Sequence, residues 1–209
     1  MTLDIITTDG RLLLLEDSDF DISTGLLVKY NEYHVFVVHN PDRWVVNGHI
    51  KEAAVVGVGG KLEPGETVLD CVKRECKEEI NTDVRISDSE VTYVVTDEYI
   101  NKFTLGGAEK PRPYYIIELK GREPGRKPYI VVFSYKGEIY EEPNPGDVSA
   151  ILLARESALH HLMCGPTTVK FMKEQPVKFI ERIHLPDDLH LIPCGTLLTY
   201  LKLKYWHKK

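Results

Sequence analysis

The chain has 209 residues and a mass of 23.9 kDa, and 43% of its residues are hydrophobic and 28% charged. This composition is typical of a globular protein with its own core, and it excludes a disordered chain, a collagen-like repeat and a small disulfide scaffold. The most apolar stretch, residues 53–58, is far shorter than the roughly 20 residues of a membrane-spanning helix, and the first residues show no signal-peptide pattern. We therefore expect a cytoplasmic protein without membrane contact.

The net charge of −6 is unevenly distributed along the chain. Residues 1–154 contain 17 Lys and Arg against 27 Asp and Glu, a balance of −10, whereas residues 155–209 contain 9 against 5, a balance of +4. An acidic body argues against nucleic acid as a partner and suits a site where carboxylates surround a metal ion. The four cysteines contain no C-x-x-C pair, and we expect buried, reduced thiols at Cys71, Cys76, Cys164 and Cys194.

Short runs rich in apolar and β-branched residues predict strands, and turn residues such as Gly, Pro, Asn and Asp separate them. In chain order these runs are residues 11–16, 26–30, 34–39, 53–58, 91–96, 114–119, 129–135 and 149–153. The last part of the chain is predicted to be helical, with pieces at residues 156–163, 168–174 and 196–206.

The best-defined helix is predicted over residues 68–80, directly after a glycine-rich loop. Thr67 is expected to cap its first turn, and Asp70, three residues later, completes an approximate capping box. Apolar residues then recur at spacings of three and four, which gives the helix one face toward the core. Asn81 stands where a helix usually ends in the left-handed conformation, which Asn tolerates second only to Gly.

Three glutamates share the other side of this helix, because residues three and four apart lie above one another. Glu75 is followed four residues later by Glu79 and not by a lysine, and Glu78 lies beside both. Like charges at this spacing repel, at a cost of a few tenths of a kcal/mol. Clustered carboxylates of this kind suit Mg²⁺ or Mn²⁺, hard cations that also bind phosphate oxygens.

The segment around these glutamates resembles the Nudix box of the MutT-like hydrolases, whose pattern is G-x5-E-x7-R-E-U-x-E-E-x-G-U, with U aliphatic. Six residues match its fixed identities at the right offsets: Gly60, Glu66, Arg74, Glu75, Glu78 and Glu79. Asn81 replaces the final glycine and Thr82 the closing aliphatic residue, so no charged position of the box is lost.

The resemblance implies the α/β fold of this family, an α/β/α sandwich with a mixed central β-sheet, plus a helical C-terminal extension. We expect a Nudix hydrolase domain over residues 1–154, with the box at 60–82 and the N-terminal strands of residues 1–30 packed on it. Residues 155–209 are expected to be the extension of the same domain. Members of the family often form homodimers, so a second copy of the chain is an expected partner.

The resemblance also implies roles for the residues of the box. Glu75 and Glu79 would be the primary ligands of Mg²⁺ or Mn²⁺, and Glu78 would be a third ligand or a ligand to a second ion. The carbonyl of Gly59 commonly adds an oxygen in this family. These residues would hold the metal that neutralises phosphate oxygens and acidifies a water molecule.

Two further roles concern positioning and proton transfer. Glu66 and Arg74 would pair and fix the loop against the helix, which preorganises the carboxylates. The general base differs between family members: some use the glutamate at the position of Glu75, and others use an acid on a later loop. The later-loop candidates here are Glu98, Glu138, Glu141 and Glu142.

The implied reaction is hydrolysis of the diphosphate linkage in a nucleoside diphosphate joined to another moiety. Nucleotide sugars, dinucleoside polyphosphates and modified nucleoside triphosphates remain open as substrates, and the loop at residues 97–113 is expected to face the substrate. Two alternatives also remain open. One is a non-catalytic, Nudix-like protein that senses a nucleotide, and the other is an isomerase on the same fold that depends on a catalytic cysteine.

Overall fold

The computed structural model describes residues 3–6, 12–15, 20–96, 99–104, 110–120, 127, 129–163 and 167–205. The helices are η1 (Pro41–Arg43), α1 (Val68–Ile80), η2 (Glu156–Leu162), α2 (Val169–Lys173) and α3 (Gly195–Tyr205). The strands of the first half are β1 (Leu3–Ile6), β2 (Leu12–Leu15), β3 (Phe20–Tyr30), β4 (Tyr33–Val38), β5 (Val45–Asn47), β6 (Ile50–Val56), β7 (Arg85–Ser87), β8 (Thr92–Val95) and β9 (Ile100–Phe103). Those of the second half are β10 (Tyr115–Lys120), β11 (Tyr129–Ile139), β12 (Ala150–Arg155), β13 (Thr167–Thr168), β14 (Val177–Glu181) and β15 (His190–Pro193).

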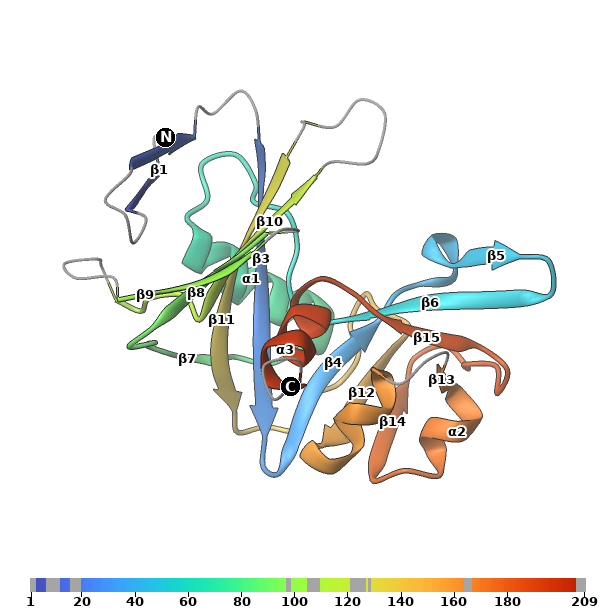
Figure 1. Ribbon diagram of the computed structural model, residues 1–209. Helices are drawn as coiled ribbons and strands as arrows, with labels where there is room; N and C mark the ends of the chain where they lie inside the picture. The colour runs from blue at the N-terminus through green and yellow to red at the C-terminus, as the bar shows by residue number, and fades with distance from the viewer. Residues whose placement is uncertain are drawn as a thin grey trace.

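Most of the described strands form one large mixed sheet (Figure 1). Its main path runs β13-β15-β6-β4-β3-β11-β10-β8-β9, while β12 pairs with β4 and β14, β5 with β6, and β7 with β11. The pairs β3–β11, β8–β10 and β6–β15 are parallel, and the other pairs are antiparallel. Strands β1 and β2 pair with each other as a separate two-stranded sheet.

Helices α1 and α3 lie on opposite faces of the sheet (Figure 1). One apolar cluster packs α1, through Val72, Cys76 and Ile80, against β3, β4 and β11. The other packs α3, through Leu197 and Leu201, against the opposite face of the same strands. This arrangement confirms the expected α/β/α sandwich with a mixed central sheet.

The C-terminal region contains more strand than the sequence predicted. The expected helical pieces are present as η2, α2 and α3, but β13, β14 and β15 lie between them and join the large sheet. The predicted helices of the extension are confirmed, and the short strands between them are an addition that the sequence did not predict. These strands have two to five residues, and no residue of β14 is fully buried, so the apolar alternation that identifies a strand is too short to detect.

Helix α1 begins and ends as its sequence predicts. The Thr67 hydroxyl accepts a hydrogen bond from the backbone N–H of Asp70 at 3.2 Å, and the Asp70 carboxylate accepts one from the backbone N–H of Thr67 at 3.4 Å. Asn81 ends the helix with φ 55° and ψ 29°, the left-handed conformation. Local interactions thus fix both ends of the element that carries the three glutamates.

Replacing Thr67 by alanine is expected to lower the free energy of unfolding by about 1 kcal/mol, because the N–H of Asp70 loses its acceptor. Urea unfolding of the two proteins measures the difference. The matched control is Thr67→Ser, which keeps the hydroxyl and should unfold close to the unmodified protein. Equal midpoints for alanine and serine would show that the capping box adds no stability.

Within the described residues, no helix is long and apolar enough to cross a lipid bilayer.

Candidate active site

The glycine loop after β6 is held between β3 and α1. The carbonyls of Val58 and Gly60 accept hydrogen bonds from the backbone N–H groups of Leu26 and Thr24, at 2.6 and 2.8 Å. Between them Gly59 has φ +149°, and a Cβ there would lie 2.3 Å from the Thr24 carbonyl oxygen, so only glycine fits. The Gly59 N–H donates to Oε2 of Glu79 at 2.9 Å, which brings the loop directly onto the glutamates.

Arg74 connects the loop to the helix. Its Nε and Nη2 donate to the two carboxylate oxygens of Glu66, at 2.9 and 3.2 Å, and Nη2 also donates to the Lys61 carbonyl at 3.1 Å. Its Nη1 donates to both Glu75 and Glu78 at 2.8 Å. The hydrogen bonds from this guanidinium hold the pKa of the Glu66 carboxyl below its usual range. The structure therefore places Glu66 and Arg74 in a bidentate ion pair, which fixes the orientation of both side chains.

The three glutamates of α1 differ in their surroundings. Glu79 is 8% exposed, and burial, together with the charges of Glu75 and Asp147, raises its pKa to about 8. Burial also raises the pKa of Glu75, with the charges of Glu78 and Asp147 acting in the same direction against the hydrogen bond from Arg74. The side chain of Glu78 is 48% exposed. Two of the carboxylates are thus desolvated and repel each other, while the third faces water.

Asp147 is a fourth carboxylate of the site that the sequence analysis did not single out. The segment before β12 closes the end of α1: the N–H groups of Asn144, Gly146 and Asp147 donate to the carbonyls of Ile80, Glu79 and Glu78, at 3.1, 3.0 and 2.9 Å. These are carbonyls of the last helical turn, which have no partner within the helix. A Cβ at Gly146 would lie 1.9 Å from the Glu78 carbonyl oxygen, so the close approach requires glycine.

A residue of the C-terminal region holds the Asp147 segment in place. Arg182 Nε donates to the Val148 carbonyl at 2.7 Å, and its Nη2 donates to the Asp147 carbonyl and to Oδ1 of Asn40, at 3.2 and 2.9 Å. Asn40 Nδ2 also donates to the Asp147 carbonyl. Segments that are far apart in the sequence are therefore tied to one backbone stretch of the site.

These groups line a cleft of about 850 Å³. Its acidic lining residues are Glu75, Glu78, Glu79 and Asp147, and its basic ones are His39, Arg43 and Lys61. Gly195 and Thr196, at the beginning of α3, form part of another wall. Burial lowers the pKa of His39, and the Arg43 charge acts in the same direction.

The later-loop candidates lie elsewhere. Glu138 is on β11, where its Oε2 lies 3.5 Å from both Arg85 Nη2 and the Tyr140 hydroxyl, and it lines a different cavity. Glu141 and Glu142 are exposed in the turn after β11, and neither lines the cleft. Glu98 lies outside the described residues. None of the described candidates therefore lines the cleft, and the additional acid there is Asp147.

Among the described side chains, no group of three His, Cys, Asp or Glu residues converges closely enough to hold a metal ion in this arrangement. The contacts of Arg74 explain why. Its Nη1 donates to both Glu75 and Glu78, so the positive charge of the guanidinium already lies between these two carboxylates.

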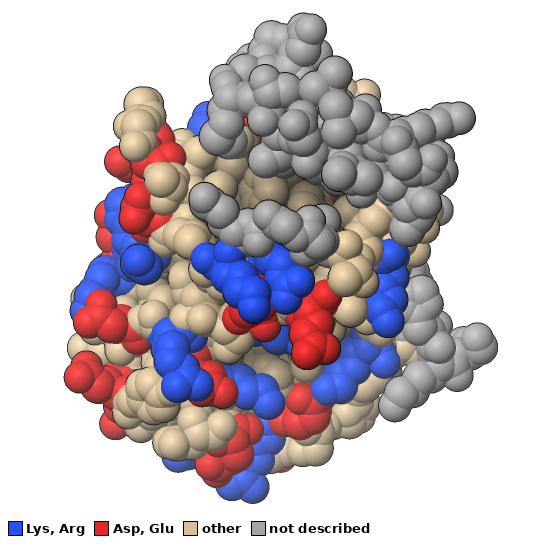
Figure 2. All heavy atoms as spheres, turned by 90° about the vertical axis from the view of Figure 1, so that its left-hand side faces the viewer, with Lys and Arg blue, Asp and Glu red and all other residues tan. Residues whose placement is uncertain are grey.

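Among the described residues, the charged side chains on the face shown in Figure 2 are of both signs. Lys and Arg side chains there alternate with Asp and Glu side chains, and neither sign covers the face continuously. Phosphate-backbone binding requires a basic stripe or patch.

Comparison with known proteins places this geometry in a family. The family model of the NUDIX domain matches residues 5–160. No curated protein matches the chain. Solved structures similar to it include a NUDIX-family hydrolase from Clostridium perfringens, 14% identical with a TM-score of 0.46 over 70% of this chain and 87% of that one.

Two further solved structures are similar at comparable levels. A NUDIX hydrolase from Nitrosomonas europaea is 13% identical, with a TM-score of 0.40 over 92% of this chain and 94% of that one. An ADP-ribose pyrophosphatase from Streptococcus suis is 15% identical, with a TM-score of 0.37 over 64% and 72%. Because these likenesses are distant, the family-model match alone carries the assignment. That match spans the glycine loop, helix α1 and Asp147, and the chain therefore belongs to the NUDIX hydrolase family.

Proposed function

We propose that the protein hydrolyses the diphosphate linkage of a nucleoside diphosphate joined to another moiety, in a reaction that depends on Mg²⁺ or Mn²⁺. The moiety would be a sugar, a second nucleotide or the remaining phosphate of a modified nucleoside triphosphate. The observation that carries the proposal is the gathering of four carboxylates, two of them desolvated, in one cleft beside Arg43 and Lys61.

The donor chemistry of the cleft fits a hard divalent cation. Burial raises the pKa of both Glu75 and Glu79, and the charge of Glu75 raises that of Glu79 further, so a cation between them would relieve this cost. Oxygen ligands are those that Mg²⁺ and Mn²⁺ prefer. Glu75, Glu78 and Glu79 would hold the ion, with the carbonyl of Gly59 as a further ligand. When bound, the ion neutralises phosphate oxygens and lowers the pKa of a bound water.

Binding the ion would require Arg74 to release part of its present contacts. Its Nη1 would leave Glu75 and Glu78, while Nε and Nη2 would keep the two bonds to Glu66. The guanidinium would then remain as a fixed support between loop and helix. In this way Glu66 would act by positioning Arg74 and not by contact with substrate.

The other residues of the cleft would bind the substrate and move the proton. Arg43, on η1, is close enough to lower the pKa of Glu79, so it would attract the phosphate oxygens. Asp147 is the acid of the cleft whose carboxylate forms no hydrogen bond or ion pair with another described residue, whereas Glu75 already accepts from Arg74. We assign Asp147 as the group that accepts the proton of the attacking water.

The thiols of the described cysteines disfavour the isomerase alternative. Burial raises the pKa of Cys71 to about 11 and that of Cys76 to about 12, and burial also raises that of Cys194. A catalytic cysteine needs a thiolate, which these surroundings oppose. Cys164 lies outside the described residues.

The test is product release from a panel of ADP-ribose, UDP-glucose, diadenosine tetraphosphate, NADH, dGTP and oxidised dGTP. Each is incubated with Mg²⁺, with Mn²⁺ and with a chelator. We expect metal-dependent release of a mononucleotide from at least one member and none in the chelator. Nucleotide binding without release from any member would contradict the hydrolase and support the nucleotide-sensing alternative.

A further inference from the structure

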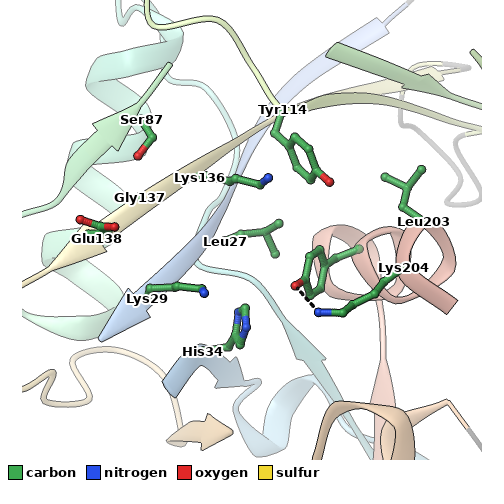
Figure 3. A pocket seen from close by; sticks show the side chains of 11 residues that line it. Leu27, Lys29, His34, Ser87, Tyr114, Lys136, Gly137, Glu138, Leu203 and Lys204 are labelled. Carbon is green, nitrogen blue, oxygen red and sulfur yellow. Dashed lines mark hydrogen bonds between the residues drawn. The ribbon is translucent and has the colours of Figure 1, made fainter. Parts of the chain in front are cut away.

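A second cavity of about 480 Å³ lies at the other end of α3 from the carboxylate cleft. Gly195 and Thr196 begin the helix and line the cleft, whereas Tyr200 and the residues near the helix end line this cavity. Figure 3 shows two of the latter, Leu203 and Lys204. Its volume falls in the range of roughly 300–1,000 Å³ found for small-molecule sites. The two sites share no lining residue.

Three lysines from three elements surround this cavity. Lys29 on β3 and Lys136 on β11 project from neighbouring parallel strands toward Lys204 on α3 (Figure 3). Lys204 pairs with Glu156. In the part of the chain that the structure describes, neither Lys29 nor Lys136 forms an ion pair, and the acid of the lining, Glu138, is turned toward Arg85.

The neighbouring groups respond to this positive charge. The pKa of Lys136 is lowered by burial and by the charges of Lys29 and Lys204. The pKa of His34, which also lines the cavity, is lowered to about 4 by burial and by the same two lysines. An anion between the lysines would offset this repulsion.

Aromatic and apolar side chains form the other walls. Lys136 Nζ lies 3.3 Å from the centroid of the Tyr114 ring, and Lys204 Nζ donates to the Tyr200 hydroxyl at 3.2 Å. Leu27 and Leu203 complete an apolar surface beside these rings. The cavity therefore combines a place for negative charge with flat surfaces on which an aromatic ring can stack.

We propose that this cavity binds a small phosphorylated molecule with an aromatic ring, of the class of a nucleoside monophosphate. Its phosphate would lie between Lys29, Lys136 and Lys204, and its ring would lie against Tyr114 and Tyr200. The site is separate from the carboxylate cleft, and the inference does not depend on the proposed hydrolysis.

The test is calorimetric titration of the full chain with AMP in a chelator, with inorganic phosphate and adenosine as separate arms. We expect AMP to bind more tightly than either part. Lys29→Ala and Lys136→Ala should each weaken AMP binding about tenfold, because each removes a charged partner of the phosphate. Lys51→Ala, which removes an exposed lysine on β6, should leave the affinity unchanged, and Arg43→Ala reports any nucleotide that binds in the cleft instead.

Two results would overturn the proposal. Equal AMP affinity in the unmodified protein and in Lys29→Ala would exclude the lysines as the phosphate site, and a loss confined to Arg43→Ala would place the nucleotide in the cleft. If inorganic phosphate bound as tightly as AMP, the aromatic ring would add nothing to the affinity, and the proposed contacts of the ring with Tyr114 and Tyr200 would be wrong. Thermal unfolding of each variant checks the fold, and the exposed Lys29 carries the test if Lys136→Ala does not fold. Because no turnover is measured, failure of the hydrolase proposal would leave this result unaffected.

Discussion

Replacing Glu79 by glutamine is expected to reduce metal-dependent turnover by more than about 10²-fold while the protein remains folded. Glutamine has nearly the same shape and keeps an oxygen that can accept the Gly59 N–H, so the loop stays in place. It loses the charge that a divalent cation would need in this buried position. Substitution of a residue that only supports a metal ligand reduces metal affinity or activity roughly 10–100-fold, and we expect the loss of a ligand itself to have a larger effect.

The measurement is kcat/KM with the substrate that the panel identifies, at several Mg²⁺ concentrations. The matched control is Glu174→Gln, which makes the same chemical change at an exposed residue after α2 and should retain full turnover. Glu138→Gln should also retain it, because that carboxylate lies outside the cleft. Full activity in Glu79→Gln would show that the carboxylate cleft is not the catalytic site.

The parts of this site that could be predicted from sequence are those fixed by neighbours along the chain. The helix α1, its Thr67–Asp70 box and the left-handed Asn81 depend on contacts within a few residues, and local patterns describe such contacts well. The position of the three glutamates on one side of the helix could also be predicted, because it follows from their spacing in the sequence alone. Their unequal burial does not follow from spacing, because the glycine loop covers Glu79 and leaves Glu78 in water.

Asp147 shows what a local pattern cannot supply. It reaches the glutamates because the N–H groups of residues 144, 146 and 147 satisfy the last carbonyls of α1, and because Arg182 holds the same segment from the C-terminal region. Each of these contacts joins residues more than 30 positions apart. Nothing in the sequence favours Asp147 over Glu138, Glu141 or Glu142, because only the backbone path brings Asp147 to the cleft.

The short strands of the C-terminal region were missed for a related reason. Strand β15 has four residues and ends in a proline, and it becomes a strand because β6 offers it a parallel partner over residues 52–55. Strand β14 likewise depends on the buried strand β12 beside it. In both cases the tertiary partner, and not the segment's own composition, determines the structure.

Without metal, the stability of the protein is expected to fall between about pH 4.5 and pH 8 through the titration of Glu79. Its pKa is about 8 in the folded protein and 4.5 in the unfolded reference, so the folded state binds this proton more tightly. The stabilisation is therefore complete below pH 4.5 and is lost as the pH rises through 8. The difference between these two pKa values corresponds to a loss of at most about 5 kcal/mol in the free energy of unfolding.

The comparison of the unmodified protein with Glu79→Gln, in a chelator, isolates this contribution. Other groups titrate in both proteins: burial lowers the pKa of His34 from 6.5 to about 4, so its contribution to stability rises between these two pH values, and this effect cancels in the difference. Urea unfolding at pH 5 should give similar free energies, whereas at pH 8.5 the variant should be the more stable by several kcal/mol. Saturating Mg²⁺ should raise the stability of the unmodified protein at pH 8.5, because a bound cation favours the ionised carboxylate, and should leave the variant nearly unchanged. Parallel pH profiles of the free energy of unfolding for the two proteins would mean that burial does not keep Glu79 protonated. The pair of Glu75 and Glu79 would then no longer support a metal site.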